Sequence, residues 1–164
     1  MELTDEQSNL IKNIPFLMAA QQTPNTSNSL YGRAYLNGAE NAVKSAWTKV
    51  TLDTKSFSSG ITCDLTNHRF TALTAGYYFV NGMVTYQSYE SGKSLVVGIY
   101  LNGSNTVYSL GAGFVVGNLA TQRVSDLIHL NVGDYVELYT YNNFSADAAL
   151  QNGSTYTFLD IFLI

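Results

Sequence analysis

Hydrophobic and polar residues alternate in short stretches along most of the chain. Such alternation predicts β-strands, because successive side chains of a strand point to opposite faces. From Arg33 onward the stretches are separated by residues that favour turns, mainly Gly, Asn, Asp and Ser. We expect strands at residues 34–36, 47–53, 69–73, 77–87, 95–101, 121–130, 135–142 and 155–164. No helical period separates them, so the pattern predicts an all-β fold, an antiparallel two-sheet jelly-roll sandwich.

Glycine marks the expected turns between these strands. Asn37-Gly38 and Asn102-Gly103 accept the left-handed dihedrals of tight hairpins. Gly133-Asp134 predicts another hairpin, in which the Asp134 carboxylate bonds backbone amides. Gly76 is expected to turn the chain sharply into the strand at 77–87.

Two of the predicted strands are apolar on both faces. In the strand at 77–87, one face receives Tyr77, Phe79 and Met83, and the other receives Tyr78, Val80, Val84 and Tyr86. In the last strand, one face receives Tyr156, Phe158, Phe162 and Ile164, and the other receives Leu159, Ile161 and Leu163. An antiparallel sheet with one face in water carries polar residues on that face. A second sheet or a second subunit is therefore expected to cover each strand.

The beginning of the chain has a different pattern. Thr4 can cap a helix, and Leu3, Leu10, Ile14 and Leu17 follow at near-heptad spacing. Pro15 interrupts this pattern, and residues 21–29 are polar without a hydrophobic period. We predict an N-terminal attachment segment and linker at residues 1–32, helical or extended, followed by the jelly-roll domain at residues 33–164.

Composition agrees with an all-β domain. Twelve Tyr and eight Phe stand against one Trp among 164 residues, and aromatic side chains pack well on strands. Only 12% of the residues are charged, and the net charge is −4. That charge provides no basic patch for phosphate groups, so we expect no nucleic-acid partner.

Cysteine content and hydropathy bear on the compartment. The only cysteine, Cys63, cannot form an intrachain disulfide and is predicted to be a small, partly buried thiol. The N-terminus lacks the pattern of a secretion signal, and no apolar run is long enough to span a bilayer. We expect synthesis in a cytoplasm and no membrane insertion.

The sequence lacks the common catalytic motifs. The sequence has no nucleophile elbow, no zinc-protease motif, no phosphate-binding glycine loop and no histidine or cysteine cluster. His68 and His129 are far apart and are interpreted as surface or structural histidines. We predict a protein without catalytic residues or cofactors. A polysaccharide-active enzyme is the less favoured alternative, because the acidic residues are scattered without a motif.

Several motifs occur in the order of a known family. Residues 47–53 (WTKVTLD), 70–79 (FTALTAGYYF), 130–138 (LNVGDYVEL) and 158–164 (FLDIFLI) are similar to the conserved strands of the C1q/TNF jelly roll. The resemblance extends from about Arg33 to the end of the chain. Members of that family are usually tight homotrimers, with strands of the inner sheet around a threefold axis. It implies a trimer interface made by Tyr77, Phe79, Tyr139, Tyr156, Phe158, Asp160, Phe162 and Ile164.

Asp160 departs from the family pattern, which usually has a small residue there. A partly buried carboxylate needs a partner. Three copies at a threefold axis would bind a structural cation, share protons or meet donors such as Arg69, Arg123 or His129. The simpler alternative, which we favour, is a partner within one subunit. Asp160 is therefore only a weak metal candidate.

Other stretches resemble predicted virion proteins of tailed bacteriophages. These are residues 33–41 (RAYLNGAEN), 45–54 (SAWTKVTLDT) and 67–72 (NHRFTA). The resemblance implies a head-fibre, decoration or tail-fibre knob on the virion surface, held to a capsid or tail protein by residues 1–30 and made in the host cytoplasm. The alternative is a bacterial C1q-like surface or spore-coat adhesin.

Three loops are candidates for ligand binding. Residues 86–93, 102–113 and 142–153 are rich in Tyr, Asn, Ser and Gly, which offer apolar area and adaptable hydrogen bonds. A host-surface polysaccharide suits this composition, and so does an inert decorating surface. The candidate contact residues are Tyr86, Tyr89, Tyr108, Asn142 and Phe144.

Overall fold

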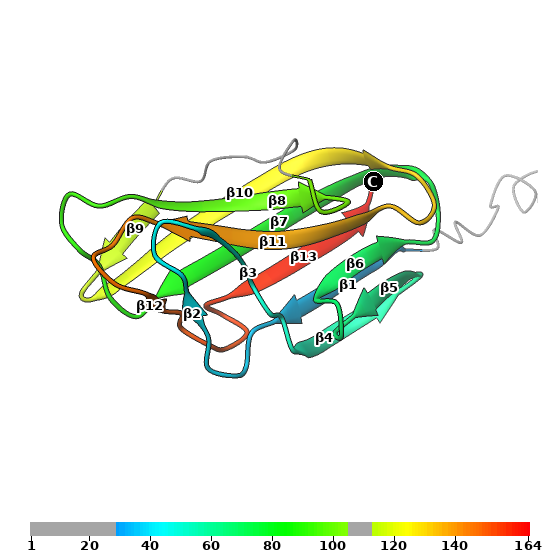
Figure 1. Cartoon of the computed structure of the whole chain (residues 1–164). Coiled ribbons are helices and arrows are strands. Elements are labelled where there is room, and N and C mark those ends of the chain that lie inside the picture. The colour runs from blue at the N-terminus through cyan, green and yellow to red at the C-terminus, as the bar shows by residue number, and fades with distance from the viewer. Residues whose placement is uncertain (1–28, 105–112) are drawn as a thin grey trace, which may run out of the picture.

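Two antiparallel sheets face each other in the computed structural model, which describes residues 29–104 and 113–164 (Figure 1). The six-stranded sheet has the order β4-β1-β13-β7-β10-β9, and in the five-stranded sheet β11 pairs with β3, β6 and β8 while β5 pairs with β6. A two-stranded sheet joins β12 to β2. The described residues contain no helix, so the prediction of an all-β jelly-roll sandwich is confirmed.

The strands have the following bounds: β1 (Tyr31–Tyr35), β2 (Asn41–Ala42), β3 (Trp47–Lys49), β4 (Thr54–Ser59), β5 (Ile61–Asp64), β6 (Arg69–Ala72), β7 (Gly76–Tyr86), β8 (Leu95–Leu101), β9 (Gly113–Val116), β10 (Leu119–Leu130), β11 (Tyr135–Asn142), β12 (Ala148–Ala149) and β13 (Phe158–Leu163).

The core lies between the two large sheets. Alternation along β7 buries Tyr78, Val80 and Val84 on its inner side, as predicted. On β13 the inner residues are Leu159 and Ile161. These side chains pack against the opposite sheet, for example Leu138 of β11. The second apolar face of β7 and β13 is not covered by this core.

The bounds of three long strands agree closely with those predicted from the sequence. The main errors of the prediction concern residues 54–64 and the start of the last strand. Strands β7, β8 and β11 were predicted to within one residue. Residues 54–64 were not predicted, because β4 carries mostly exposed polar side chains and shows no alternation. The last strand begins at Phe158 rather than residue 155, since Ser154, Thr155 and Tyr156 form a turn.

The turns agree in part. Asn102 and Gly103 have φ of 52° and 73°, and Asp134 accepts hydrogen bonds from Asn131, as predicted. The prediction at Asn37-Gly38 was wrong: both amides donate to the Asp53 carboxylate (2.8 and 2.7 Å), and Gly38 is not left-handed. Gly76 is not a sharp turn either. A Cβ there would lie 2.6 Å from Leu163 Cδ1, so Gly76 packs closely against the end of the Leu163 side chain.

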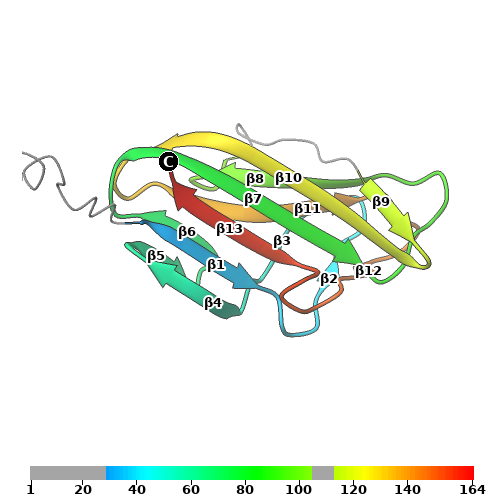
Figure 2. The ribbon, with the colours of Figure 1, turned by 180° about the vertical axis from the view of Figure 1, so that it is seen from behind.

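Both chain termini of the described domain lie at one end of the sandwich. In the strand registers Tyr31 is opposite Phe162, and Leu163 is opposite Tyr78 near the start of β7. We call this the proximal end (Figures 1 and 2). The opposite, distal end contains the end of β7 and the start of β10, about 33 Å away along an 11-residue strand. The predicted helical segment within residues 1–28 falls outside the described residues.

Candidate subunit interface

The outer face of the six-stranded sheet carries large apolar side chains without cover. We call it the aromatic face, and Figure 2 looks onto its strands. The exposed fraction is 59% for Tyr77, 52% for Leu127 and 46% for Phe162. Its exposed apolar side chains are Tyr31, Phe57, Tyr77, Leu127 and Phe162; Phe79 is half-buried and Phe158 is buried on the same face.

Strand register arranges four of these residues in one row. Tyr31 of β1 pairs with Phe162 of β13, Phe162 pairs with Phe79 of β7, and Phe79 pairs with Leu127 of β10. Paired residues of neighbouring antiparallel strands project from the same face. The Phe79 and Phe162 ring centroids are 5.3 Å apart, so this apolar row is continuous across the sheet.

The neighbouring row is polar. Arg33 of β1 pairs with Asp160 of β13, which pairs with Asn81 of β7. Arg33 Nη1 donates to both carboxylate oxygens of Asp160 (2.7 and 2.8 Å), and Asn81 Nδ2 donates to Asp160 Oδ2 (3.2 Å). The Arg33 guanidinium also lies over the Phe158 ring, 3.9 Å from its centroid. A hydrogen-bonded ion pair thus crosses the centre of an apolar surface.

The electrostatics of Asp160 follow from this position. Burial raises the pKa of Asp160 above its ordinary value, and this effect outweighs the opposing effects of the Arg33 charge and the Asn81 hydrogen bond. The interpretation of a partner within one subunit is confirmed. That partner is Arg33, which the sequence reasoning did not name. Among the described residues, no group of three or more His, Cys, Asp or Glu is placed to hold a metal.

The structure brings together most of the interface residues predicted from sequence. Tyr77, Phe79, Phe158, Asp160 and Phe162 all lie on the aromatic face, and the exposed Ile164 follows β13 at the proximal end. Tyr156 is exposed and lies in the turn before β13.

Tyr139 needs a correction, because it belongs to the other sheet. It lies on β11 and stacks on Tyr100 with 3.8 Å between ring centroids. Strand β11 pairs with β3, β6 and β8, so its outward side chains point away from the aromatic face. Sequence reasoning also missed Leu127, although alternation through residues 121–130 places it with Arg123, Ser125 and His129.

The candidate ligand residues need a larger correction. Tyr86, Asn142 and Phe144 are buried rather than displayed in loops. The Tyr86 hydroxyl hydrogen-bonds Thr140, and burial raises the pKa of Tyr86 to about 12. Asn142 Nδ2 donates to the Ala42 carbonyl (3.2 Å) and Phe144 N donates to Asn142 Oδ1 (3.1 Å). Tyr108 lies outside the described residues, and only Tyr89 is an exposed member of the set.

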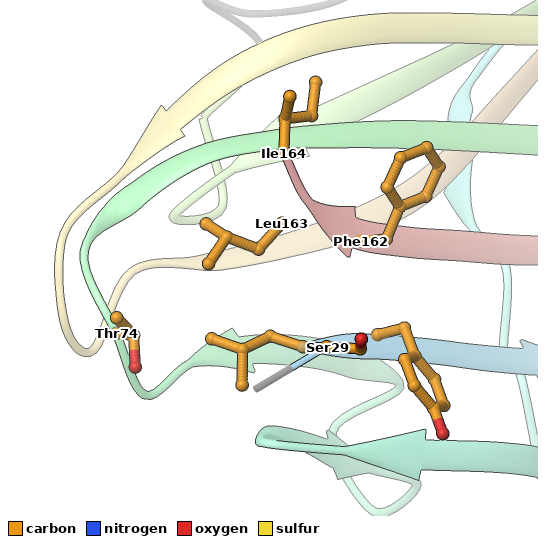
Figure 3. A pocket seen from close by; sticks show the side chains of 7 residues that line it. Ser29, Thr74, Phe162, Leu163 and Ile164 are labelled. Carbon is orange, nitrogen blue, oxygen red and sulfur yellow. The ribbon is translucent and has the colours of Figure 1, made fainter. Parts of the chain in front are cut away.

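A pocket of about 520 Å³ adjoins the aromatic face at the proximal end (Figure 3). Phe162, Leu163 and Ile164 line it at the end of β13, and Ser29 and Thr74 also line it. Because Tyr31 and Phe162 line both the pocket and the apolar row, the two form one apolar surface. No helix within the described ranges is long and apolar enough to cross a membrane.

The fold has clear relatives among solved structures. No family model matches the sequence, and no curated protein matches it. The globular domain of the zebrafish complement 1qA protein is similar with a TM-score of 0.61 and 14% identity, over 82% of this chain and 97% of that chain. The Eiger TNF of S. frugiperda is similar with a TM-score of 0.58 and 12% identity, over 84% of this chain and 93% of that chain. Murine APRIL is similar with a TM-score of 0.58 and 14% identity, over 83% of this chain and 99% of that chain. These similarities show a C1q/TNF-like jelly-roll fold.

Proposed function

We propose that this chain is a non-enzymatic structural protein that forms a homotrimer through the aromatic face. The apolar row Tyr31–Phe162–Phe79–Leu127 carries this proposal, because a folded monomer leaves it in water. Exposed apolar patches of this kind mark protein interfaces. A C1q/TNF-like fold supports a threefold arrangement. An obligate interface of about 2,000 Å² or more is typical of such assemblies.

A leucine-to-aspartate pair tests the interface. Leu127→Asp places a carboxylate in the middle of the apolar row and is expected to give monomers in sedimentation equilibrium. Leu73→Asp is the matched control, because Leu73 is exposed to a similar extent (55% against 52%) but precedes β7 in a loop. We expect the control to remain trimeric. A trimeric Leu127→Asp variant would contradict the proposed interface.

The finer proposal is a knob on the surface of a bacteriophage particle, as a head fibre, decoration protein or tail-fibre tip. The phage-like stretches at residues 33–41, 45–54 and 67–72 support it. In this arrangement residues 1–28 attach the knob to a capsid or tail protein at the proximal end, and the distal end faces outward, where it can contact host-surface glycans.

Deletion of residues 1–28 tests the attachment. The deletion retains Leu30, which is buried and whose carbonyl accepts a hydrogen bond from Leu163 N (2.8 Å). We expect a folded trimer that is no longer incorporated into particles. Unchanged incorporation would contradict the attachment role while leaving the trimer proposal intact.

A further inference from the structure

A second pocket, of about 290 Å³, lies at the distal end. The loop between β7 and β8 forms one side, and the start of β10 forms the other. It lies at the opposite end of the sandwich from Ser29, where the described chain begins. Its lining residues are Tyr89, Lys93, Ser94, Leu95, Val115, Ala120 and Gln122.

Gln122 is the unusual residue of this pocket. It lies on the inner side of β10 between the buried Ala120 and Val124, and only 9% of it is exposed. Its Oε1 atom is buried, and no described residue donates a hydrogen bond to it. A buried acceptor without a donor destabilises a fold, so packing alone does not explain a glutamine here.

The loop that faces Gln122 is fixed at several points. The Glu90 carboxylate accepts hydrogen bonds from Ser145 N and Ser145 Oγ (3.0 and 2.9 Å). Ser94 N donates to Asn143 Oδ1 (2.6 Å), and Lys93 N donates to the Glu90 carbonyl (3.1 Å). Tyr89 and Lys93 are therefore presented by a preorganised loop, which lowers the entropic cost of binding a ligand.

The side chains in this pocket offer three kinds of contact. Tyr89 is 40% exposed and is held by an edge contact with the buried Phe144 (6.4 Å between centroids). Lys93 forms no ion pair within the described part of the chain, so its ammonium can donate to a ligand oxygen. Gln122 lines the pocket wall, and its buried Oε1 is an acceptor that a rotation of the amide would turn toward a ligand hydroxyl.

We propose that this pocket binds one neutral hexose unit of a surface polysaccharide. A hexose offers hydroxyls to Gln122 and Lys93 and an apolar C–H face to Tyr89. The net charge of −4 and the Glu90 carboxylate beside Lys93 disfavour an acidic sugar. The inference rests on the proposed surface role, and a trimer would present three copies of the pocket for multivalent binding.

Saturation-transfer NMR on the full chain tests the site with tetrasaccharides of glucose, galactose, mannose or N-acetylglucosamine. A small site of this kind is expected to bind at least one of them with a Kd of about 1 mM. Gln122→Leu should weaken that binding about tenfold while its unfolding midpoint stays equal or rises, because an unpaired buried acceptor is removed. Gln151→Leu is the matched control, since Gln151 lies outside the pocket, and it should bind normally.

Three results would overturn this inference. They are failure of all four neutral sugars to bind, tighter binding of tetragalacturonate than of any neutral sugar, and full binding by the Gln122→Leu variant. The Leu127→Asp variant separates this site from the trimer proposal. A monomer should bind the tetrasaccharide with unchanged affinity and lose only the avidity for long polysaccharide.

Discussion

The two outer faces of the sandwich are both rich in aromatic residues, but they differ in how those residues are used. On the five-stranded sheet, the ring centroid of Trp47 lies 5.7 Å from that of Tyr100 and 5.8 Å from that of Tyr141. The Tyr100 ring stacks on the Tyr139 ring. These rings are buried or half-buried by one another. On the six-stranded sheet, Tyr77, Leu127 and Phe162 remain exposed. The rings of one face are covered by contacts within the chain, and the exposed side chains of the other form the face through which we propose that the trimer assembles.

The ion pairs on the two faces also differ in their surroundings. Lys49 and Glu137 join β3 to β11 on the five-stranded sheet, beside the ring cluster. Arg33 and Asp160 instead lie in the middle of the aromatic face, where a covering subunit would bury them further. Aromatic content alone therefore does not identify an interface. Exposure and strand register support the proposal for the aromatic face, and they place Tyr139 on the opposite sheet.

The largest effect is expected from Tyr100→Ala, measured by urea unfolding in the monomeric Leu127→Asp background. Tyr100 is 6% exposed between Trp47 and Tyr139, so removal of its ring should cost about 3–5 kcal/mol. Phe162→Ala in the same background should cost less than about 1.5 kcal/mol, because nearly half of that side chain is already in water.

The order of the two substitutions should be reversed when their effects on trimer assembly are measured. With Leu127 intact, Phe162→Ala should weaken the trimer, whereas Tyr100→Ala should keep the native subunit number by light scattering. The comparison between the two faces would be wrong if Tyr100→Ala gave monomers that remained fully folded.

The second effect concerns the ion pair on the aromatic face. Arg33→Met leaves the partly buried Asp160 without its cation and should destabilise the monomer by about 2 kcal/mol at pH 7, less than for a fully buried pair because a quarter of each side chain is exposed. The pKa of Asp160, already raised by burial, should rise further. Because the pKa of Asp160 is higher in the folded protein than its unfolded value of 3.8, the contribution of this carboxyl to folding stability is fully present below pH 3.8. That contribution is lost as the pH rises through the folded pKa.

The penalty of Arg33→Met relative to the parent should therefore shrink as pH falls from 7 towards 4. The double variant Arg33→Met with Asp160→Leu is the control, and it should recover the stability because no unpaired charge remains. An equal penalty at both pH values would show that the Arg33 side chain acts through packing on Phe158 instead.

The third effect lies between the sheets, at Tyr86. Its folded pKa is about 12 and its unfolded pKa is 10.0, so the unfolded state loses the phenolic proton first as pH rises. Stability should then fall above pH 10 by about 1.4 kcal/mol per pH unit until about pH 12. Tyr86→Phe should remove this part of the slope in alkaline urea titrations. An unchanged fall of stability with pH in Tyr86→Phe would mean that other titrating groups cause it.

The sequence was a good guide where alternation was regular and a poor one elsewhere. The inner and outer sets of β7 and β13 followed directly from the two-residue period. Partner assignment did not, because Arg33 and Asp160 are 127 positions apart and only the β1–β13 register brings them together. Tyr86, Asn142 and Phe144 were misplaced for another reason. Composition resembling a binding loop does not show whether a strand end is buried.

The smallest effect is expected at Tyr156, which is exposed in the turn before β13. The sequence resemblance predicts this residue in the trimer interface, and its backbone carbonyl accepts a hydrogen bond from Thr85 Oγ1 (2.8 Å). Tyr156→Ser keeps that backbone contact and should change stability by less than about 0.5 kcal/mol. Sedimentation equilibrium should still show trimers, whereas dissociation comparable to that of Leu127→Asp would extend the interface from the aromatic face to the distal turn.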